Sequence, residues 1–360
     1  MYIQSLTLKN FRNYEDTKIL FNNHINIIYG KNAQGKTNIL EALYLCSTSK
    51  SQRTANMREL IMFNQEEAHV AVEIFKDNQI QIIDVHLKKN NKKSIAINKV
   101  SIRKLNELFG VMKIIMFSPE DLGLIKNGPK ERRRFIDLEL CQMNPLYYHY
   151  LKSYYLVLKQ RNNLLKEIKK NSSAIDQLDA WDIQLIEYGK YIMKYRKIFI
   201  DELNPYFNSN HYEISGQSEK SNILYERNVE IDLFEKKLKK NIKYDIAIGS
   251  TSVGPHKDDL RFEINGVDIR KYGSQGQQRT AALSLKLSEI ELIKNLGEDK
   301  PILLLDDVLS ELDESRQNYL IQNIKDIQTI ITCTGIEDFI NSKIKIENMI
   351  KIEKGTWIQQ

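Results

Sequence analysis

A glycine-bounded loop near the N-terminus carries the residue types that bind phosphate. Residues 30–37 read GKNAQGKT, which matches the spacing G-x-x-x-x-G-K-[ST] of a phosphate-binding loop. The apolar run INIIY precedes this loop, and Ile39, Leu40 and Leu43 follow it at helical spacing. We therefore expect a strand, a tight turn and a helix that together hold a nucleoside triphosphate.

Each residue type in the loop has a chemical role. Gly30 and Gly35 let the backbone curl so that its N–H groups point inward at phosphate oxygens. Lys36 adds a positive charge, and the Thr37 hydroxyl can ligate Mg²⁺. The helix that starts there turns its positive end toward the phosphates. The residues expected to complete the cradle are Lys31, Asn32, Ala33 and Gln34.

A second chemical element follows an apolar run near the C-terminus. In ILLLDD, four aliphatic residues lead directly to Asp306 and Asp307. A triphosphatase needs a carboxylate on Mg²⁺ at the end of a buried strand, and Asp306 occupies that place. Asp307 is then positioned to polarise the attacking water. The alternative explanation is a pair of solvated aspartates at a strand end.

The third element is YGSQGQQRT, in which Ser274, Gln275, Gly276 and Gln277 stand at the start of a long helix. The N–H groups at a helix start can bind an anion. A serine N-cap with a flexible entry would explain the same residues. Asp313, in the following SELD, is consistent with another helix cap.

Composition and patterning indicate a folded protein of α/β class. The chain has 360 residues, 42% of them hydrophobic and 28% charged, which excludes a disordered chain. It contains no apolar run of about 20 residues and no basic-then-apolar leader, and its three cysteines are far apart. We expect a cytoplasmic protein with reduced cysteines. The net charge of +6 mildly favours a polyanionic partner.

The pattern of apolar residues divides the chain into three stretches. Strand patterns dominate residues 1–118, and helical spacing with few glycines dominates residues 119–248. Strands return over residues 249–360, with a turn at Asn265-Gly266. We predict one discontinuous α/β domain, 1–118 with 249–360, and an inserted helical lobe, 119–248.

These motifs together resemble the ABC-type ATPases of chromosome maintenance, the group that includes SMC and Rad50. The segments LTLKNFRNYE, FSPEDLGLIKNGPKERRRFID, VGPHKDDL and LLLDDVLSELD look closer still to the RecF family of bacterial recombination mediators. The resemblance runs from about residue 1 to residue 335. SQGQ at 274–277 resembles the family's signature motif, and SELD at 310–313 resembles its D-loop.

The resemblance implies a fold, a cofactor set and partners. The fold would be an ABC ATPase head, with mixed parallel and antiparallel strands, and a helical lobe in place of a long coiled coil. ATP with Mg²⁺ would drive dimerisation, the signature of one copy closing over the nucleotide of the other. The role would be gap repair on single-stranded and duplex DNA, with RecO and RecR helping to load RecA, and a part in replication restart and the SOS response.

The resemblance also assigns residues. Lys36 and Asp307 would carry hydrolysis, while Thr37 and Asp306 would hold the metal. Arg12 lies in a region that touches the nucleotide in the family.

In the loop, Lys31 stands where the family usually has asparagine or glutamate. Two further departures from the family pattern bear on turnover. Asp307 stands where most ABC ATPases have glutamate. The strand QTIITCT ends without the switch histidine of transporters. A carboxylate one methylene shorter holds water less well, so we expect slow, DNA-stimulated hydrolysis suited to a switch. No glutamine in the FSPEDL region could be assigned as a Q-loop.

Basic and polar residues offer weaker predictions. Arg132, Arg133 and Arg134 form the densest basic cluster and are expected to contact DNA, although a solvated charged face is the bland alternative. The tyrosines of residues 147–155 favour a helical core over base stacking. His256 and Asp258 lack a third ligand nearby, which favours a polar corner over a metal site.

Three other protein classes fit the sequence less well. An ABC transporter subunit would need a switch histidine, and it usually has a shorter stretch between the loop and the acid strand. An SMC or Rad50 protein would need long heptad runs. A nucleic-acid scaffold with a dead site conflicts with the intact Lys36, Thr37 and Asp306.

Overall fold

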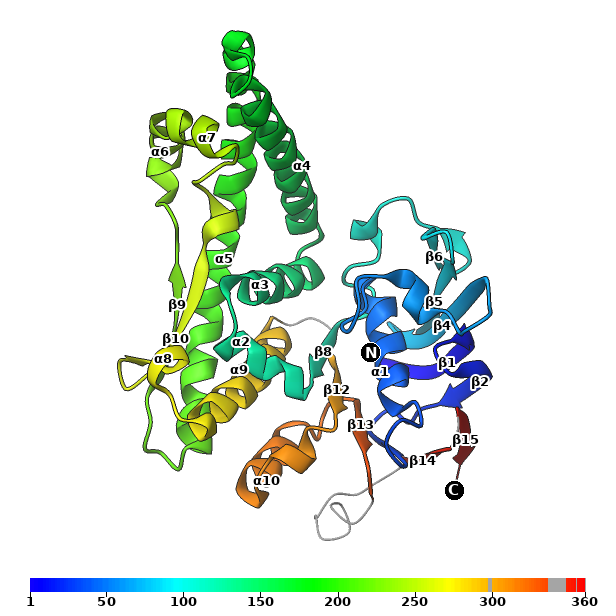
Figure 1. The fold of residues 1–360 in the computed structure, drawn as a ribbon. Coiled ribbons are helices and arrows are strands. Elements are labelled where there is room, and N and C mark those ends of the chain that lie inside the picture. The colour runs from blue at the N-terminus through cyan, green and yellow to red at the C-terminus, as the bar shows by residue number, and fades with distance from the viewer. Residues whose placement is uncertain (297–299, 336–347, 354, 360) are drawn as a thin grey trace. The chain divides into compact units, whose positions relative to one another are not determined.

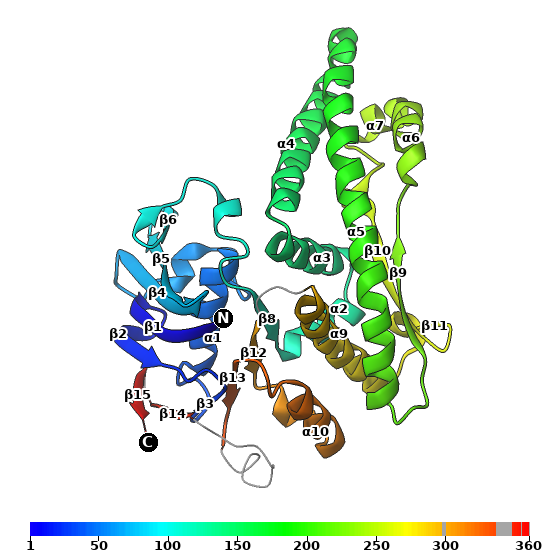
Figure 2. The same cartoon turned by 180° about the vertical axis from the view of Figure 1, so that it is seen from behind.

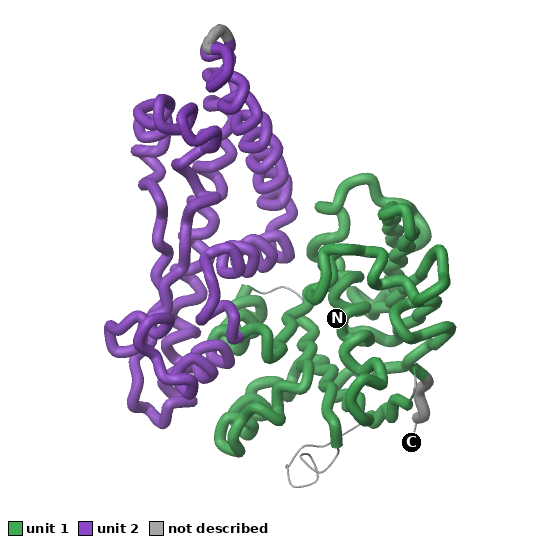
Figure 3. Tube along the Cα trace, viewed as in Figure 1, with its two compact units in different colours: residues 1–121, 285–360 green, residues 122–284 purple. Residues whose placement is uncertain are grey.

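The computed structural model describes residues 1–296, 300–335, 348–353 and 355–359. These residues form two compact units, coloured separately in Figure 3: residues 1–121 with 285–360, and residues 122–284. The sequence placed its boundaries at 118/119 and 248/249, and these stay a prediction of domain limits. The compact units differ from them most at the second boundary, because the strand of residues 259–264 pairs with the strand of residues 221–226 in the second unit.

An antiparallel sheet forms one layer of the first unit (Figure 1). Its strand order is β2-β1-β4-β5-β6-β7. Side chains alternate between buried and less buried along β4, as expected for a sheet with one face on the core. The strands of this sheet are β1 (Tyr2–Phe11), β2 (Tyr14–Leu20), β4 (Glu67–Lys76), β5 (Gln79–Lys88), β6 (Lys93–Ile97) and β7 (Val100–Ser101).

A mainly parallel sheet forms the other layer of the first unit. Its strand order is β15-β14-β3-β13-β12-β8, and β14 to β8 run parallel to their neighbours. Both faces of this sheet are covered, so the side chains of β12 and β13 are buried along nearly the whole strand instead of alternating. The strands of this sheet are β3 (Ile25–Tyr29), β8 (Ile114–Phe117), β12 (Ile302–Asp306), β13 (Thr329–Cys333), β14 (Asn348–Glu353) and β15 (Thr356–Gln359).

Among the described residues, two helices belong wholly to this unit, α1 (Lys36–Thr48) and α10 (Glu314–Asn323), and α9 (Gln275–Asn295) ends in it. The Asp313 carboxylate caps α10 by accepting the Arg316 N–H at 3.0 Å, which confirms the predicted cap. The three cysteines, Cys46, Cys141 and Cys333, are buried, and none of them forms a disulfide. Within the described ranges, no helix has the length and apolar character needed to cross a membrane.

The second unit is mainly helical. Helices α4 and α5 lie side by side over much of their length in both views (Figures 1 and 2). A small sheet of order β11-β10-β9 packs against α5. The helices are α2 (Leu122–Lys126), α3 (Pro129–Met143), α4 (Pro145–Ile168), α5 (Leu178–Ile214), α6 (Phe234–Lys240), α7 (Ile242–Ile248) and α8 (Ile269–Tyr272). The strands are β9 (Ser221–Glu226), β10 (Asp259–Ile264) and β11 (Val267–Asp268).

Most element types predicted from the sequence are confirmed. The hairpin turn at Asn265-Gly266 joins β10 to β11, and a second hairpin tip lies between β5 and β6. The sequence NKVSIRKLNELFG, residues 98–110, predicts a short helix, and this prediction is wrong in extent. That stretch instead contains β7 and a single 3₁₀ turn at Leu105–Glu107, because Val100 and Ser101 pair with β6.

Buried charges hold the second unit together. Arg196 on α5 is 1% exposed, and its guanidinium donates to the Asp137 carboxylate of α3 at 2.9 and 3.0 Å. It also donates to the Pro255 carbonyl at 2.7 Å. The hydroxyl of Tyr147 on α4 donates to Asp137 at 2.6 Å. One guanidinium and one carboxylate therefore tie three helices and a loop.

Replacing Arg196 with leucine should strongly destabilise the second unit. Loss of the guanidinium leaves the Asp137 carboxylate buried without a cation, and breaking a buried pair in this way costs about 3–5 kcal/mol. The midpoint of urea denaturation, followed by helical circular dichroism, measures the change. Lys197→Leu is the matched control, because its ion pair with Asp201 is exposed on the same helix. Equal midpoints for the two variants would contradict this role of Arg196.

Candidate phosphate-binding site

The loop of residues 30–35 joins β3 to α1, and its conformation requires glycine at both ends. Gly30 and Gly35 have φ angles of +152° and +111°. A Cβ atom on Gly35 would meet the Asn13 amide at 2.5 Å, and one on Gly30 would meet the Ile352 carbonyl oxygen at 2.4 Å. Side chains are excluded at both positions, so only backbone atoms occupy the two ends of this turn.

The Lys36 side chain lies inside the turn. It is 8% exposed, and its ammonium donates to the carbonyl oxygens of Gly30 at 2.6 Å and Lys31 at 3.0 Å. Burial lowers the pKa of Lys36, while the nearby Asp307 carboxylate opposes that shift. The Lys36 side chain therefore lies close to the carboxylates of Asp306 and Asp307.

Asp306 connects three adjacent strands. Its Oδ1 atom accepts hydrogen bonds from the Thr37 hydroxyl at 2.9 Å and from the Thr332 hydroxyl at 2.8 Å. Thr37 follows β3, Thr332 lies in β13 and Asp306 ends β12, and these strands are neighbours in the sheet. The structure thus brings together the hydroxyl and the carboxylate predicted to bind the metal. In the described part of the chain, no cluster of three or more His, Cys, Asp or Glu side chains offers another metal site.

Asp307 turns away from the strand direction, with a φ of +53°. Its backbone N–H donates to the Thr332 hydroxyl at 3.0 Å, and its carbonyl accepts from the Ser310 hydroxyl at 2.8 Å. Burial raises the pKa of Asp307, and Asp306 raises it further, while Lys36 acts in the opposite direction. A carboxylate with a raised pKa is a better proton acceptor at neutral pH.

A cavity of about 300 Å³ adjoins these groups. The predicted residues that line it are Asn32, Ala33, Gly35, Lys36, Thr37, Asp306 and Asp307. Three further lining residues, Asn38, Arg53 and Thr332, were not predicted. Asn38 directly follows Thr37, so its place beside the loop was a signal, whereas Arg53 and Thr332 lie outside the loop in the sequence.

Arg12 lies away from the inside of the loop. Its guanidinium donates to both oxygens of the buried Glu41 carboxylate, at 2.9 and 2.8 Å. It lines a second cavity of about 680 Å³, which shares Asn38 and Arg53 with the first. Arg12 is therefore held beside the phosphate cavity by an ion pair with α1.

Ser274 to Gln277 lie at the surface of the second unit, where α9 begins. The Ser274 hydroxyl accepts the Gln277 N–H at 3.1 Å, and the Gln277 side-chain oxygen accepts the Ser274 N–H at 2.9 Å. This reciprocal pair is a capping box. Ser274, Gln275 and Gly276 are exposed.

The three arginines of α3 have different environments. Arg132 is 1% exposed and donates to both oxygens of Asp259, at 2.6 and 2.9 Å. Arg133 is half-buried and donates to the Asp258 carbonyl at 2.6 Å, whereas Arg134 is exposed. The buried Arg132 side chain is not placed to meet a DNA backbone, contrary to the expectation for the cluster.

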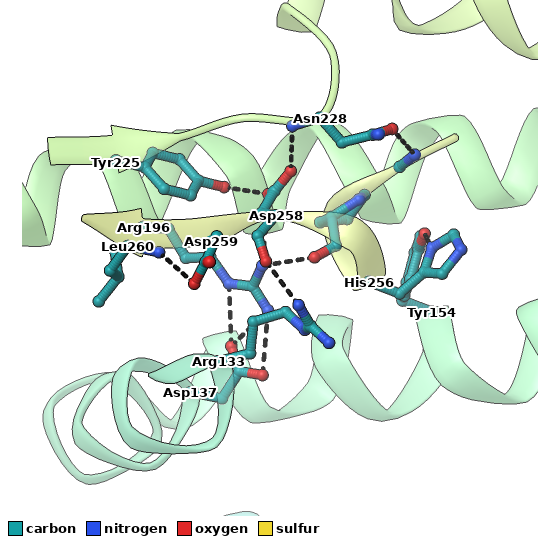
Figure 4. Close-up of polar contacts among 12 residues, drawn as sticks. Arg133, Asp137, Tyr154, Arg196, Tyr225, Asn228, His256, Asp258, Asp259 and Leu260 are labelled. Atoms are coloured by element: carbon teal, nitrogen blue, oxygen red, sulfur yellow. Dashed lines mark hydrogen bonds and ion pairs between the residues drawn. The ribbon is translucent and has the colours of Figure 1, made fainter. Parts of the chain in front are cut away.

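His256 and Asp258 each make polar contacts with neighbouring residues of a network in the second unit (Figure 4). The His256 ring contacts the Thr251 carbonyl through Nε2 at 2.9 Å and the Tyr154 hydroxyl through Nδ1 at 2.7 Å. Because a carbonyl only accepts, Nε2 carries the proton and Nδ1 accepts from Tyr154. Burial lowers the pKa of His256 to about 4. The ring is therefore neutral at pH 7.

Asp258 is held by several donors in this network (Figure 4). Its carboxylate accepts from the Tyr225 hydroxyl, from the Asn228 N–H at 2.7 Å and from Arg196 at 3.4 Å. The polar-corner interpretation of His256 and Asp258 agrees with this geometry. The Tyr147 and Tyr154 side chains are buried, as expected for a helical core.

The chain is similar to known proteins along nearly its whole length. The family model described as RecF/RecN/SMC N terminal domain matches residues 2–356. The DNA replication and repair protein RecF of Lachnoclostridium phytofermentans is 54% identical over 356 residues, which cover 99% of each chain. That of Lachnospira eligens is 52% identical over 357 residues, 99% of this chain and 98% of the relative.

Solved structures extend the similarity to the fold. A structure of the recombination mediator protein RecF-ATP in the RecFOR pathway has a TM-score of 0.92 and 37% identity, covering 100% of this chain and 97% of that one. An Smc head domain from Pyrococcus furiosus has a TM-score of 0.58 at 16% identity, covering 100% and 96%. The predicted fold, an ATPase head with a helical lobe, is confirmed.

The neutral His256 predicts a pH dependence of stability. Its pKa is about 4 in the folded chain, against 6.5 for an ordinary histidine, so between these values the unfolded chain binds more protons. Stability should therefore fall as pH drops below about 6.5, by up to about 3 kcal/mol near pH 4. Urea denaturation at several pH values measures this slope. His256→Asn should remove that part of the slope, and the exposed His149→Asn should keep it. Identical slopes for wild type and His256→Asn would contradict this prediction.

Proposed function

Because the chain belongs to the RecF family and so functions in DNA replication and repair, we propose that it is an ATP-operated switch that binds DNA at single-strand gaps. The observation that carries the proposal is the hydrogen bond between Thr37 and Asp306 beside the buried Lys36. A triphosphate site needs this combination of hydroxyl, carboxylate and ammonium on a glycine-bounded turn.

The residues of the loop suit a triphosphate. The turn would lose its shape if Gly30 or Gly35 carried a Cβ atom, and its inner face offers backbone groups and the Lys36 ammonium. Phosphate oxygens would replace the Gly30 and Lys31 carbonyls as acceptors of the ammonium. A relative described in complex with ATP supports the choice of ATP. The second cavity, lined by Arg12, would receive the nucleoside end.

Thr37 and Asp306 are the residues that would hold Mg²⁺. Both are oxygen donors, as this hard cation prefers, and they already lie 2.9 Å apart. When bound, Mg²⁺ neutralises part of the phosphate charge. The Thr332 hydroxyl donates to the same Asp306 oxygen at 2.8 Å and so fixes the direction of the carboxylate.

Asp307 would accept a proton from the attacking water. Its raised pKa suits a proton acceptor, while its short side chain limits how closely it holds water. Slow hydrolysis follows, as a switch requires. The chain would bind ATP, dimerise, and reset when the nucleotide is hydrolysed.

The signature segment would act on the nucleotide of a second copy. Ser274, Gln275 and Gly276 are exposed at the start of α9, so a partner's phosphates could reach their N–H groups. Each dimer would then contain two composite sites.

DNA, RecO and RecR are the proposed partners, and loading of RecA is the proposed outcome. The family membership and the printed RecFOR pathway of a solved relative support them. On α3, the exposed Arg134 is the stronger candidate for a phosphate contact, and Arg133 is the weaker. The expected part in replication restart and the SOS response, and a cytoplasmic location, belong to the same proposal.

Lys36→Ala should abolish ATP-dependent dimerisation. A charge-assisted hydrogen bond contributes about 1.5–3 kcal/mol, so ATP affinity should fall about 10- to 100-fold. Equilibrium binding of a fluorescent ATP analogue and sedimentation velocity measure the two effects. Lys9→Ala, which removes an exposed lysine from the same unit, is the control. If ATP leaves the wild type monomeric and does not alter its DNA binding, the switch proposal is lost.

Asp307→Asn should separate binding from hydrolysis. The amide cannot accept the proton, so turnover should fall about 100-fold while ATP binding persists. The ATP-bound dimer should outlive that of the wild type, as measured by the decay of the dimer after excess ATP is removed. Asp16→Asn, an exposed carboxylate in the same unit, should behave like the wild type. Unchanged turnover in Asp307→Asn would exclude this residue as the proton acceptor.

A further inference from the structure

The side-chain amide of Gln277 is engaged at both ends. Its oxygen accepts the Ser274 N–H at 2.9 Å within the capping box. Its nitrogen donates to Oε1 of Glu219 at 2.8 Å. Glu219 lies between α5 and β9, 58 residues before Gln277 in the sequence, and both residues belong to the second unit. A residue outside the motif thus holds the last residue of the motif.

A carboxylate at this point fixes which way the amide faces. An ionised carboxylate only accepts hydrogen bonds, so it requires the NH₂ group of Gln277 to face Glu219. The amide oxygen must then face the Ser274 N–H, as it does. Without Glu219, rotation of the amide would set its NH₂ group against that N–H and open half of the capping box.

The Glu219 carboxylate also contacts a buried histidine, His211. Its second carboxylate oxygen, Oε2, lies 2.9 Å from Nε2 of His211. His211 is 0% exposed and lies in the last turn of α5. The Glu219 N–H also donates to the Ser215 hydroxyl at 3.2 Å. The two carboxylate oxygens therefore join the end of α5 to the start of α9.

The outer face of the motif stays open. Ser274, Gln275 and Gly276 are exposed, and a Cβ atom on Gly276 would meet nothing closer than the Ser274 hydroxyl at 3.8 Å. Gly276 is thus not required by packing within this chain. Its small size leaves room for a group that approaches from outside.

We infer that Glu219 is a positioning residue for the signature segment, with His211 as its support. Glu219 orders the first turn of α9 so that its N–H groups and the Ser274 hydroxyl are preset for the triphosphate of a second copy. This inference rests on the proposed function, in which that segment closes over ATP. It assigns Glu219 to dimerisation and not to nucleotide binding within one chain.

Glu219→Ala should weaken the ATP-bound dimer without weakening ATP binding to the monomer. A hydrogen bond to a charged group is lost at each composite site, so the dimer dissociation constant should rise at least about tenfold. Glu219→Gln should keep most of the wild-type affinity of the ATP-bound dimer, because the amide oxygen of the new side chain can still accept a hydrogen bond from Gln277. Glu213→Ala, an exposed carboxylate on the last turn of α5, is the matched control.

Sedimentation velocity with a slowly hydrolysed ATP analogue measures the dimer, and analogue binding at low protein concentration measures the monomer site. Hydrogen–deuterium exchange of residues 274–280 in the monomer without nucleotide measures the order of the α9 start directly. Faster exchange in Glu219→Ala, with rescue in Glu219→Gln, supports the inference. Wild-type exchange and wild-type dimerisation in Glu219→Ala would overturn it, as would equal loss in both Glu219 variants.

The same experiment separates this inference from the proposed function. If ATP fails to dimerise the wild type, the proposed function fails. The exchange measurement then still decides whether Glu219 orders the motif.

Discussion

The candidate site depends on one geometric constraint, the parallel order β3-β13-β12. Parallel neighbours end at the same edge of a sheet, so the loop after β3 and the acids after β12 meet there although 268 residues separate Thr37 from Asp306. The Oδ1 atom of Asp306 links these segments, because it accepts hydrogen bonds from the Thr37 hydroxyl and from the Thr332 hydroxyl of β13, the strand between β3 and β12. A shift of β12 by one residue would turn Asp306 to the other face of the sheet. The four apolar residues before Asp306 therefore pack in the core and also determine on which face of the sheet its carboxylate lies.

The second unit differs from the first-unit site in that charged side chains lie in its core. Arg132, Arg161 and Arg196 are at most 1% exposed, and each pairs with aspartate. Such pairs contribute little net stability relative to apolar packing, but they penalise any arrangement that leaves a charge unpaired. We infer that they serve specificity, because Asp137, Asp258 and Asp259 each find a partner on another element. The same aspartates explain why basic residues of α3 are not simply a DNA-facing cluster.

Sequence reasoning reached the phosphate loop and the acid pair because their signals are local. The spacing of Gly30 to Thr37 and the aliphatic run before Asp306 depend only on neighbours in the chain. Arg53 and Thr332 were missed because they reach the cavity through tertiary packing, whereas Asn38 directly follows Thr37 in the chain. Arg132 was assigned to the surface because charge normally predicts exposure, and its partner Asp259 lies 127 residues away. The second compact unit extends past residue 248 because β10 pairs with β9, and this non-local pairing has no local signal in the sequence.

Helix α5 links the features that sequence alone could not connect. It spans 37 residues, which corresponds to about 55 Å at 1.5 Å per residue. Arg196 in its interior anchors the buried network, and His211 in its last turn supports Glu219 and, through it, Gln277. Because a buried ion pair fixes the position of α5 at its interior, the residues in its last turn are held in a defined place. The signature segment is therefore ordered by contacts made within its own chain, and a second copy would meet a motif whose first turn is already set.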